Sequence, residues 1–377
     1  MATPTPAQRG FSMPAEWEPH EATWLGWPQN PTDWPGKMNA IQWVYGEIVR
    51  KIAPGEKVRI LVGSEAVEAR ARHVLRTARA DLGAVEFFRW PTDRGWMRDS
   101  GPIFVRRTTR GRGQTAIVHF HFNAWARYQD WHRDYRVPER VSRAMGLPLF
   151  HARWQGRPFV LEGGGIDVNG RGTLLTTEEC YLDTKTQVRN PGLGRREIEI
   201  TLQRYLGARN VLWLGSGIAG DDTHGHVDDI CRFVNPTTAV LCQCQDPGDV
   251  NCRTLAENFE RLQDMRLEDG SRIQIVPLPM PAPLYWREVR LPASYANFYI
   301  ANAAVLVPTF NDPADRQALG LLAELFPERT VVGIHAVDLV LGFGTLHCLT
   351  QQQPAAQRGE PPSGLLPARE NGGQQKR

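Results

Sequence analysis

Hydrophobic positions follow two periods along the chain, one typical of α-helices and one typical of buried strands. Residues 40–52 carry isoleucine and valine at the spacing of one helix face, and Pro54-Gly55 ends this pattern. The apolar run 58–62 predicts the strand that follows. The same succession of helix and strand returns at 65–88, 197–214, 255–276 and 316–334. This alternation predicts an α/β fold.

Hairpin patterns stand between these helix–strand pairs. The clearest is 165–175, where Asn169-Gly170 is the strongest short signal for a hairpin turn. The others are 101–118, 230–241 and 298–307. A polar side chain precedes each hairpin, and a further one stands near the C-terminal end: Asp99, Glu162, His226 with Asp228, Asn297, and Cys348. Such self-similarity predicts pseudo-symmetric modules around an axis, as in a propeller, with one reactive side chain per module pointing inward.

Composition excludes several classes of partner. The chain has 377 residues and a net charge of +3 with both signs mixed, so neither nucleic acid nor a membrane surface is expected. No apolar run reaches the about 18 residues of a membrane span, and residues 1–8 lack the apolar core of a signal peptide. Six scattered Cys favour free thiols in a reducing cytoplasm. We expect one domain over residues 1–353 and a disordered tail over 354–377.

The segment 220–229 concentrates titratable side chains, with two His and four Asp in ten residues. In an extended conformation His226 and Asp228 would point to the same face, because strand side chains alternate. The sequence therefore predicts an imidazole and a carboxylate that project into a common space.

Cys348 is a candidate nucleophile. It follows Gly342 and Gly344, which let the backbone approach a ligand closely. The alternative is a buried thiol with a packing role only. His226 supplies an imidazole that can move the thiol proton. Glu162 precedes a glycine run that enters a hairpin and not a helix, which argues against a phosphate-binding loop and for a carboxylate that orients the imidazole.

Trp96 and Asp99 together are suited to bind a planar cation. Trp96 stands three residues before Asp99, so an aromatic face and a carboxylate are available together. The alternative is a surface ion pair of Asp99 with Arg94 or Arg98.

No metal is expected. The cysteines between residues 231 and 252 contain no Cys-x2-Cys pair. His119 and His121 alternate with apolar residues and are interpreted as strand residues, not as ligands.

Several of these segments coincide with motifs of a known family. They are Met13-Pro14-Ala15-Glu16-Trp17-Glu18-Pro19-His20, Trp96-Met97-Arg98-Asp99, Glu162-Gly163-Gly164, Gly225-His226-Val227-Asp228 and His347-Cys348-Leu349-Thr350-Gln351-Gln352. Over about residues 11 to 353 the chain resembles the agmatine deiminases, within the bacterial peptidyl-arginine deiminase family of guanidine-modifying enzymes. The resemblance implies a five-bladed, pseudo-symmetric α/β propeller (the pentein fold) with a central active site.

The resemblance also implies roles for individual residues. Cys348 would attack the guanidinium carbon and form an amidino-cysteine intermediate. His226 would act as general acid and base, and Glu162 would hydrogen-bond to it. Asp99 and Asp228 would bind the guanidinium nitrogens. Trp96 would cover the guanidinium face, with Asn297 expected as a further substrate-binding residue.

The implied reaction is hydrolysis of agmatine to N-carbamoylputrescine and ammonia, without metal or organic cofactor, by a homo-oligomer in the cytoplasm. Asp221 and Asp222, with Asp229 beside them, favour a substrate with a second positive charge. Free arginine would need a cation for its carboxylate, for which Arg98 and Arg127 are the candidates. Two alternatives stay open: deimination of peptidyl arginine or another guanidine, and a guanidine-binding protein without catalysis. The sequence departs from the family pattern at Phe343, Thr345 and His224.

Overall fold

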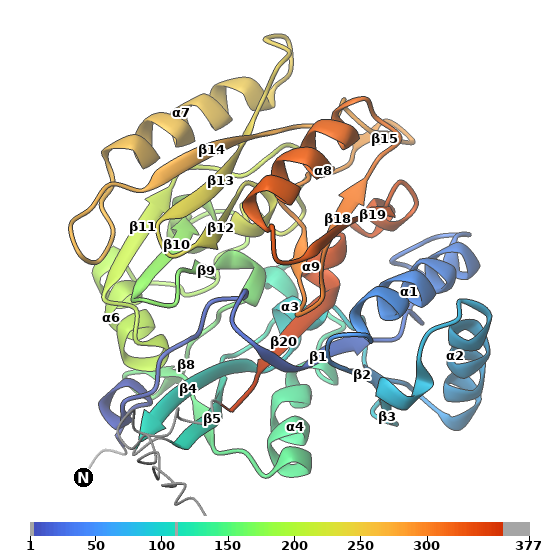
Figure 1. The fold of residues 1–377 in the computed structure, drawn as a ribbon. Coiled ribbons are helices and arrows are strands. Elements are labelled where there is room, and N and C mark those ends of the chain that lie inside the picture. The colour runs from blue at the N-terminus through green and yellow to red at the C-terminus, as the bar shows by residue number, and fades with distance from the viewer. Residues whose placement is uncertain (1–3, 110–111, 357–377) are drawn as a thin grey trace, which may run out of the picture.

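The computed structural model describes residues 4–109 and 112–356. Its N-terminal sheet has the strand order β20-β1-β2-β3, where β1 runs parallel to β2 and antiparallel to β20. The strands are β1 His20–Gly26, β2 Lys57–Leu61, β3 Val85–Phe88 and β20 Thr350–Pro354. Helices α1 (Met38–Ile52) and α2 (Glu65–Thr77) connect the parallel strands. The first and last strands of the described chain therefore share one sheet (Figure 1).

Four further sheets share one plan, in which an antiparallel hairpin is followed by a helix and a third strand parallel to the second. Their elements are β4 Ile103–Thr109, β5 Arg112–His119, α4 Val137–Met145 and β6 Leu149–His151; β9 Asp167–Val168, β10 Thr173–Thr177, α6 Arg195–Leu206 and β11 Asn210–Leu214; β12 Cys231–Asn235, β13 Thr238–Gln243, α7 Asn251–Asp264 and β14 Gln274–Pro279; and β17 Tyr299–Ile300, β18 Ala304–Thr309, α8 Ala314–Leu325 and β19 Thr330–His335. The predicted succession of hairpin, helix and strand is confirmed within the described residues.

Short elements complete the chain. Two hairpins are β7 Arg153–Trp154 with β8 Arg157–Pro158, and β15 Tyr285–Trp286 with β16 Val289–Arg290. The short helices are α3 Met97–Ser100, α5 Glu178–Leu182 and α9 Leu346–Leu349. The 3-10 turns are η1 Ala7–Arg9, η2 Leu82–Ala84, η3 Ala124–Ala126, η4 Asp134–Arg136, η5 Gly163–Gly165, η6 Val227–Asp229 and η7 Leu339–Gly342.

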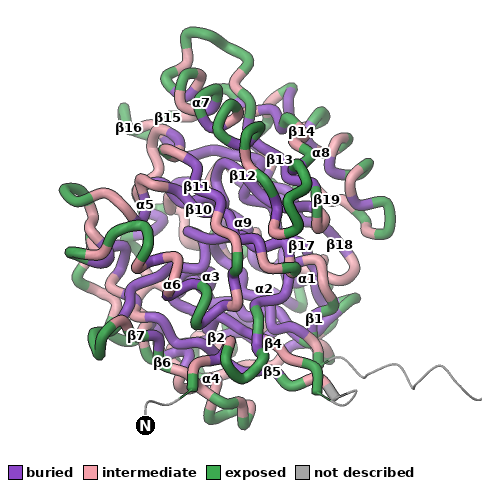
Figure 2. The backbone as a smooth tube through the Cα atoms, turned by 90° about the vertical axis from the view of Figure 1, so that its left-hand side faces the viewer, coloured by how far each residue is buried: buried purple, intermediate pink, exposed green. Residues whose placement is uncertain are grey.

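The core explains why the helices lie where they do. Helix α1 turns one apolar face inward at the predicted spacing: Ile41, Tyr45, Ile48, Val49 and Ile52. The largest apolar cluster joins side chains of the N-terminal sheet to side chains of the last two sheets. Figure 2 shows the buried backbone running through the inner strands, with the exposed segments at the periphery. The sheets therefore pack through a shared interior.

The turns that precede the edge strands of four sheets meet in that interior. α3 precedes β4, η5 precedes β9, η6 precedes β12 and α9 precedes β20. α3 packs against both α9 and η5, and η5 packs against η6; α3 and α9 lie near the centre of the view in Figure 1. Residues far apart in sequence are thereby gathered into one place.

Three expectations need correction or fall outside the described residues. His226 to Asp228 do not form a strand, because residues 227–229 form the turn η6. Cys244 and Cys252 form a disulfide, because the turn into α7 brings their Cα atoms to 4.9 Å, so four described Cys and not six are free thiols. The expected tail begins too early, because Pro354 is the buried last residue of β20, and residues 357–377 of that tail lie outside the described residues. In the part of the chain that is described, no helix combines the length and apolar composition needed to cross a membrane.

Candidate active site

Cys348 lies in α9 and is held by Asn297. The Asn297 Nδ2 donates to Sγ at 3.1 Å. The Asn297 Oδ1 accepts hydrogen bonds from the Thr345 hydroxyl at 2.7 Å and the His347 N–H at 3.1 Å. An added Cβ on Gly344 would lie 3.1 Å from Sγ, tighter than an ordinary contact, so glycine lets the turn pass close to the sulfur without crowding it. Asn297, expected to bind substrate, therefore contacts the nucleophile turn and does not line the cavity described below.

The surroundings of Cys348 favour the neutral thiol. Its residue is only 4% exposed, and the Asp228 Oδ2 lies 3.7 Å from Sγ. Burial raises the pKa of the Cys348 thiol well above its ordinary value, and the Asp228, Asp229 and Asp99 carboxylates raise it further. In the free site Cys348 therefore carries a protonated thiol.

His226 lies between two carboxylates. Its Nδ1 is 3.8 Å from the Asp99 Oδ1 and its Nε2 is 3.7 Å from the Glu162 Oε2. Burial lowers the pKa of His226, but the nearby Asp99 carboxylate, with Cys180 and Glu162, raises it well above the ordinary value. A Cβ on Gly164 would lie 2.6 Å from the His226 Nδ1, so this arrangement requires glycine. The imidazole therefore carries a positive charge between the two carboxylates.

Glu162 is oriented by a residue that the sequence did not single out. The Arg189 Nε donates to the Glu162 Oε1 at 3.2 Å, and both side chains are fully buried. Burial raises the pKa of Glu162, but Arg189 and His226 lower it below the ordinary value. Arg189 is one of 44 Lys and Arg residues and lies on a loop, so no local pattern distinguishes it.

Asp99 and Asp228 both approach Gly164, where an added Cβ would lie 2.8 Å from the Asp99 Oδ1 and 3.0 Å from the Asp228 Oδ2. Asp99 accepts hydrogen bonds from the Trp125 Nε1 and the Gly164 N–H, each at 2.9 Å. Burial raises the pKa of Asp99 to about 6. The Asp228 Oδ2 lies 2.6 Å from the His347 Nδ1, whereas its Oδ1 is buried without a hydrogen-bond partner among the described residues. The expected alternative, an ion pair of Asp99 with Arg94 or Arg98, is wrong.

Glu16, from the N-terminal motif, forms a buried network of ion pairs behind the site. Glu16 pairs with Arg98 and Arg232, each at 3.0 Å, and its Oε2 lies 2.8 Å from the His347 Nε2. Burial raises the pKa of Glu16, but Arg232, His347 and Arg98 lower it well below the ordinary value. This buried network fixes Asp228 through His347. Because Arg98 is paired with Glu16, it is not available to bind the α-carboxylate of free arginine.

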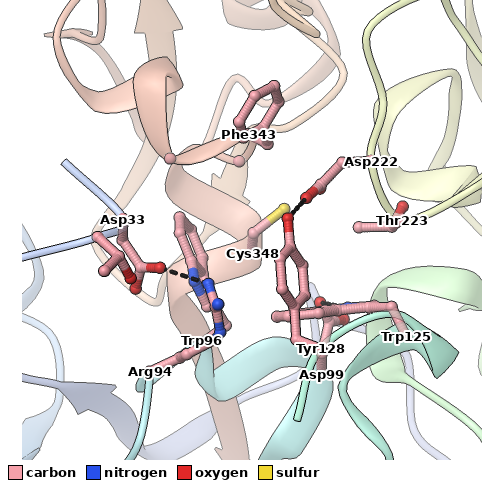
Figure 3. A pocket seen from close by; sticks show the side chains of 13 residues that line it. Asp33, Arg94, Trp96, Asp99, Trp125, Tyr128, Asp222, Thr223, Phe343 and Cys348 are labelled. Atoms are coloured by element: carbon pink, nitrogen blue, oxygen red, sulfur yellow. Dashed lines mark hydrogen bonds and ion pairs between the residues drawn. The ribbon is translucent and has the colours of Figure 1, made fainter. Parts of the chain in front are cut away.

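A cavity of about 140 Å³ opens onto the Cys348 sulfur. Figure 3 shows Asp33 and Trp96 on one side of the sulfur in this view, with Asp222 and Thr223 on the other. The lining residues are Thr32, Asp33, Arg94, Trp96, Asp99, Trp125, Tyr128, Asp222, Thr223, Gly342, Phe343, Gly344 and Cys348. Of the predicted site residues, Cys348, Asp99, Trp96 and Asp222 line it directly.

The cavity carries two further carboxylates away from Asp99. Asp222 accepts a hydrogen bond from the Tyr128 hydroxyl at 2.6 Å, and burial raises its pKa to about 6. The Asp33 Oδ1 accepts a hydrogen bond from Arg94 at 2.6 Å, while its Oδ2 is buried without a partner among the described residues. Burial raises the pKa of Asp33 to about 7. Sequence reasoning missed Asp33, Tyr128 and Arg94.

Asp221 does not reach the cavity. Its Oδ1 accepts a hydrogen bond from the Thr223 N–H at 2.8 Å. Its Oδ2 accepts from the N–H groups of Gly225 at 2.8 Å and His226 at 3.1 Å. The carboxylate therefore shapes the loop that presents His226, in place of the substrate contact expected from the sequence.

Comparison with known proteins decides the family. Residues 12–354 match the family model of the Porphyromonas-type peptidyl-arginine deiminases. The chain belongs to this family. It is 37% identical over 378 residues to an agmatine deiminase of Ectopseudomonas mendocina, with 94% of this chain and 98% of the relative covered. It is 36% identical to an agmatine deiminase of Pseudomonas aeruginosa, with 94% and 99% covered.

Solved structures of the Porphyromonas-type family share the fold. The agmatine deiminase of Enterococcus faecalis matches with a TM-score of 0.84 at 31% identity, covering 94% of this chain and 98% of that one. A Cys-to-Ser variant of the C. jejuni agmatine deiminase with substrate bound matches with a TM-score of 0.80 at 29% identity, covering 92% and 97%. The chain therefore has the mixed α/β fold of these enzymes.

The three departures from the family pattern differ in their distance from the cavity. Phe343 lines the cavity with φ at 62°, in the left-handed region that favours glycine. Thr345 lies behind the sulfur and bonds to Asn297. His224, with φ at 65°, contacts Asp183 at 2.7 Å and is not among the lining residues. Phe343 is thus the one of these three residues that lines the cavity.

Proposed function

We propose that this protein hydrolyses agmatine to N-carbamoylputrescine and ammonia. One observation carries the proposal: a buried thiol opens onto a cavity that has carboxylates both beside the sulfur and farther along its wall. A substrate with a guanidinium at one end and an ammonium at the other complements this arrangement. The relatives named agmatine deiminase support the same conclusion.

Binding begins with the guanidinium. A guanidinium has a fixed planar set of N–H donors and stays charged at any working pH, so carboxylates recognise it. Asp99 lines the cavity, and the unpartnered Asp228 Oδ1 supplies a second acceptor. Trp96 is 4% exposed and offers an aromatic face for cation–π contact.

The bound cation then activates the thiol. In the free site, burial and carboxylates keep Cys348 protonated. A guanidinium between Asp99 and Asp228 offsets their charge and adds an opposite charge beside the sulfur, which lowers the thiol pKa. The thiol proton passes to water in the cavity as the thiolate forms, and the sulfur regains a proton after the C–S bond breaks. The nucleophile therefore forms only when the substrate is in place.

The chemistry proceeds in two displacements. The Cys348 thiolate bonds to the guanidinium carbon, and ammonia departs with a proton from the His226 imidazolium, leaving an amidino-cysteine. The neutral imidazole then takes a proton from water, whose oxygen attacks the same carbon. The C–S bond breaks, and the product carries a urea group where the substrate carried a guanidinium. Glu162, held by Arg189, keeps the imidazole oriented through both steps.

The acidic cavity wall selects the substrate's other end. Asp33 and Asp222 suit a terminal ammonium, whereas the α-carboxylate of free arginine would be repelled. Among the described lining residues Arg94 is the basic one, and it is committed to Asp33 at 2.6 Å and Asp130 at 3.1 Å. Arg127 is exposed and does not line the cavity. Peptidyl arginine, which lacks both the ammonium and the free carboxylate, is the second candidate.

We also propose a closed five-bladed propeller for the arrangement of the sheets. The support is that four sheets repeat one strand plan, and that β20 pairs antiparallel with β1 and so completes the fifth, N-terminal sheet from the C-terminal side. Residues 1–353 would then be one domain. A homo-oligomer in the cytoplasm is part of the same proposal.

The decisive test compares three substrates. Ammonia release is measured side by side for agmatine, arginine and a peptide with an internal arginine, with the same enzyme preparation. We expect turnover of agmatine with much lower kcat/KM for the other two. Turnover of the peptide alone would overturn the choice of substrate and leave the thiol mechanism intact.

A further inference from the structure

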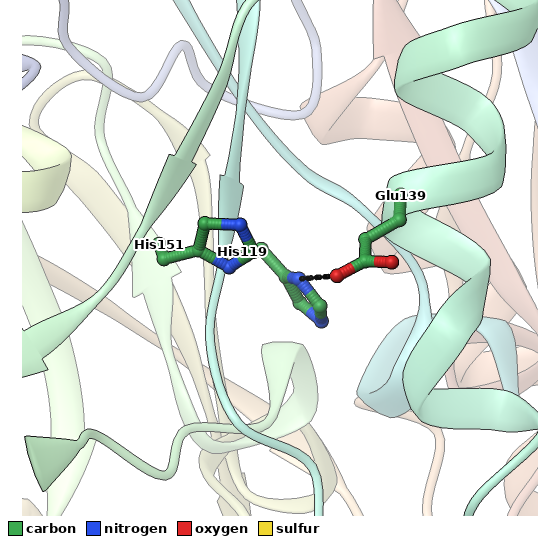
Figure 4. A group of neighbouring side chains, drawn as sticks. All are labelled: His119, Glu139 and His151. Atoms are coloured by element: carbon green, nitrogen blue, oxygen red, sulfur yellow. Dashed lines mark ion pairs between the residues drawn. The ribbon is translucent and has the colours of Figure 1, made fainter.

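Two histidines of neighbouring strands lie side by side, away from the active site. His119 at the end of β5 and His151 at the end of β6 are register partners in the parallel pair. Register partners project their side chains to the same face of a sheet. Helix α4 packs against β5 and supplies Glu139 to this group. Figure 4 shows the three side chains, with the Glu139 carboxylate facing the His119 ring.

His119 presents a lone pair toward Glu139. The residue is 2% exposed, and its Nε2 lies 2.9 Å from the Tyr135 carbonyl oxygen. A carbonyl can only accept, so Nε2 carries the hydrogen and Nδ1 has the free lone pair. Nδ1 has no hydrogen-bond partner among the described residues and lies 3.9 Å from the Glu139 Oε1. The buried His119 lone pair thus faces the carboxylate of the partly exposed Glu139, and two acceptors that face each other favour a cation between them.

The other two groups are free to complete such a site. The Glu139 Oε2 pairs with Arg143 at 3.4 Å, which leaves Oε1 for a second partner. His151 is exposed and gives access from solvent. One nitrogen or oxygen from each of His119, Glu139 and His151 lies within 4.8 Å of the others. The Tyr135 carbonyl holds the His119 tautomer, as outer partners do for ligating imidazoles.

We propose that His119, Glu139 and His151 bind a zinc ion. Two imidazole nitrogens and one carboxylate oxygen, with water in the fourth position, form a set that Zn²⁺ prefers over Mg²⁺ or Ca²⁺. Ligands at about 2.1 Å from the metal lie roughly 3.4 Å apart in a tetrahedron, so the partly and fully exposed Glu139 and His151 rotate inward on binding. The ion then joins β5, β6 and α4. The sequence around His119 predicts a strand residue and gives no sign of this group, because Glu139 and His151 are distant from His119 in the chain.

The test uses the full chain with the substitution Cys348→Ala, which removes the reactive thiol from the active site. The metal-stripped protein is titrated with ZnCl2 by isothermal calorimetry, and its melting temperature is recorded with and without zinc. We expect one zinc ion per chain and a higher melting temperature. Adding His151→Ala or Glu139→Gln is expected to weaken binding at least tenfold and to remove the thermal shift.

His132→Ala is the matched control. His132 is an exposed imidazole stacked on Trp131 and is outside the three-residue group, so its loss is expected to leave zinc affinity unchanged. The proposal is overturned if no zinc binds. It is equally overturned if His151→Ala binds zinc as tightly as its parent, because the ion then occupies another place, such as the Glu162, Cys180 and His226 group of the active site.

Discussion

Replacing Asp33 by Asn tests how the cavity selects its substrate. The Asp33 side chain is 2% exposed, pairs with Arg94 and has a second oxygen without a partner among the described residues. A hydrogen bond between a carboxylate and an ammonium is worth about 1.5 to 3 kcal/mol, which corresponds to roughly a 10- to 100-fold change in affinity. The substitution also leaves the Arg94 cation less neutralised beside the substrate's ammonium. We therefore expect kcat/KM for agmatine to fall toward the upper end of this range.

The assay separates charge recognition from general damage. Ammonia release is measured at pH 8, above the Asp33 pKa of about 7, with agmatine and with n-butylguanidine, which keeps the guanidinium and lacks the ammonium. The drop is expected for agmatine and not for n-butylguanidine. Asp130→Asn is the matched control, because Asp130 also pairs with Arg94 but does not line the cavity. Equal losses for both substrates, or equal losses in both variants, would refute the reasoning.

Three further predictions concern the thiol and the carboxylates. Asn297→Ala removes a hydrogen bond to Sγ and is expected to lower kcat roughly 10- to 100-fold; an unchanged kcat would contradict the positioning of Cys348 by Asn297. The kcat/KM for agmatine is expected to fall as pH drops through about 7 to 6, because Asp33, Asp99 and Asp222 take up protons there and lose their attraction for cations; a flat profile would contradict this. In the substrate-free enzyme, alkylation of Cys348 by iodoacetamide, followed by peptide mass mapping, is expected to keep accelerating above about pH 8.5, the ordinary thiol pKa, whereas a plateau below pH 8 would show a low thiol pKa.

The convergence of Asp99, Glu162, His226 and Cys348 was accessible from the sequence. Each stands just before an edge strand of a sheet, and the repeated hairpin pattern marks three of these four places. A repeated unit places equivalent positions in equivalent environments, so one polar residue at each such place predicts a shared site. The α/β alternation could also be predicted from the sequence, because it depends on the local spacing of apolar residues.

Other parts of the site depend on contacts between distant segments. Arg189 orients Glu162, and Asp33 pairs with Arg94, through side chains that no local pattern marks. Asp221 shows a second reason why a site residue cannot be predicted from the sequence. A loop aspartate can face a ligand or accept hydrogen bonds from its own backbone, and both choices have the same sequence signal. The disulfide of Cys244 and Cys252 likewise depends on a turn geometry that spacing alone does not give.

The most direct test of the central claim is the product formed from agmatine by the wild-type enzyme and by Cys348→Ala. N-carbamoylputrescine and ammonia are quantified for both, with Cys231→Ala as a control that removes another buried free thiol outside the cavity lining. We predict equimolar products from the wild type and from Cys231→Ala, and none above background from Cys348→Ala. Comparable product formation by Cys348→Ala would contradict the account.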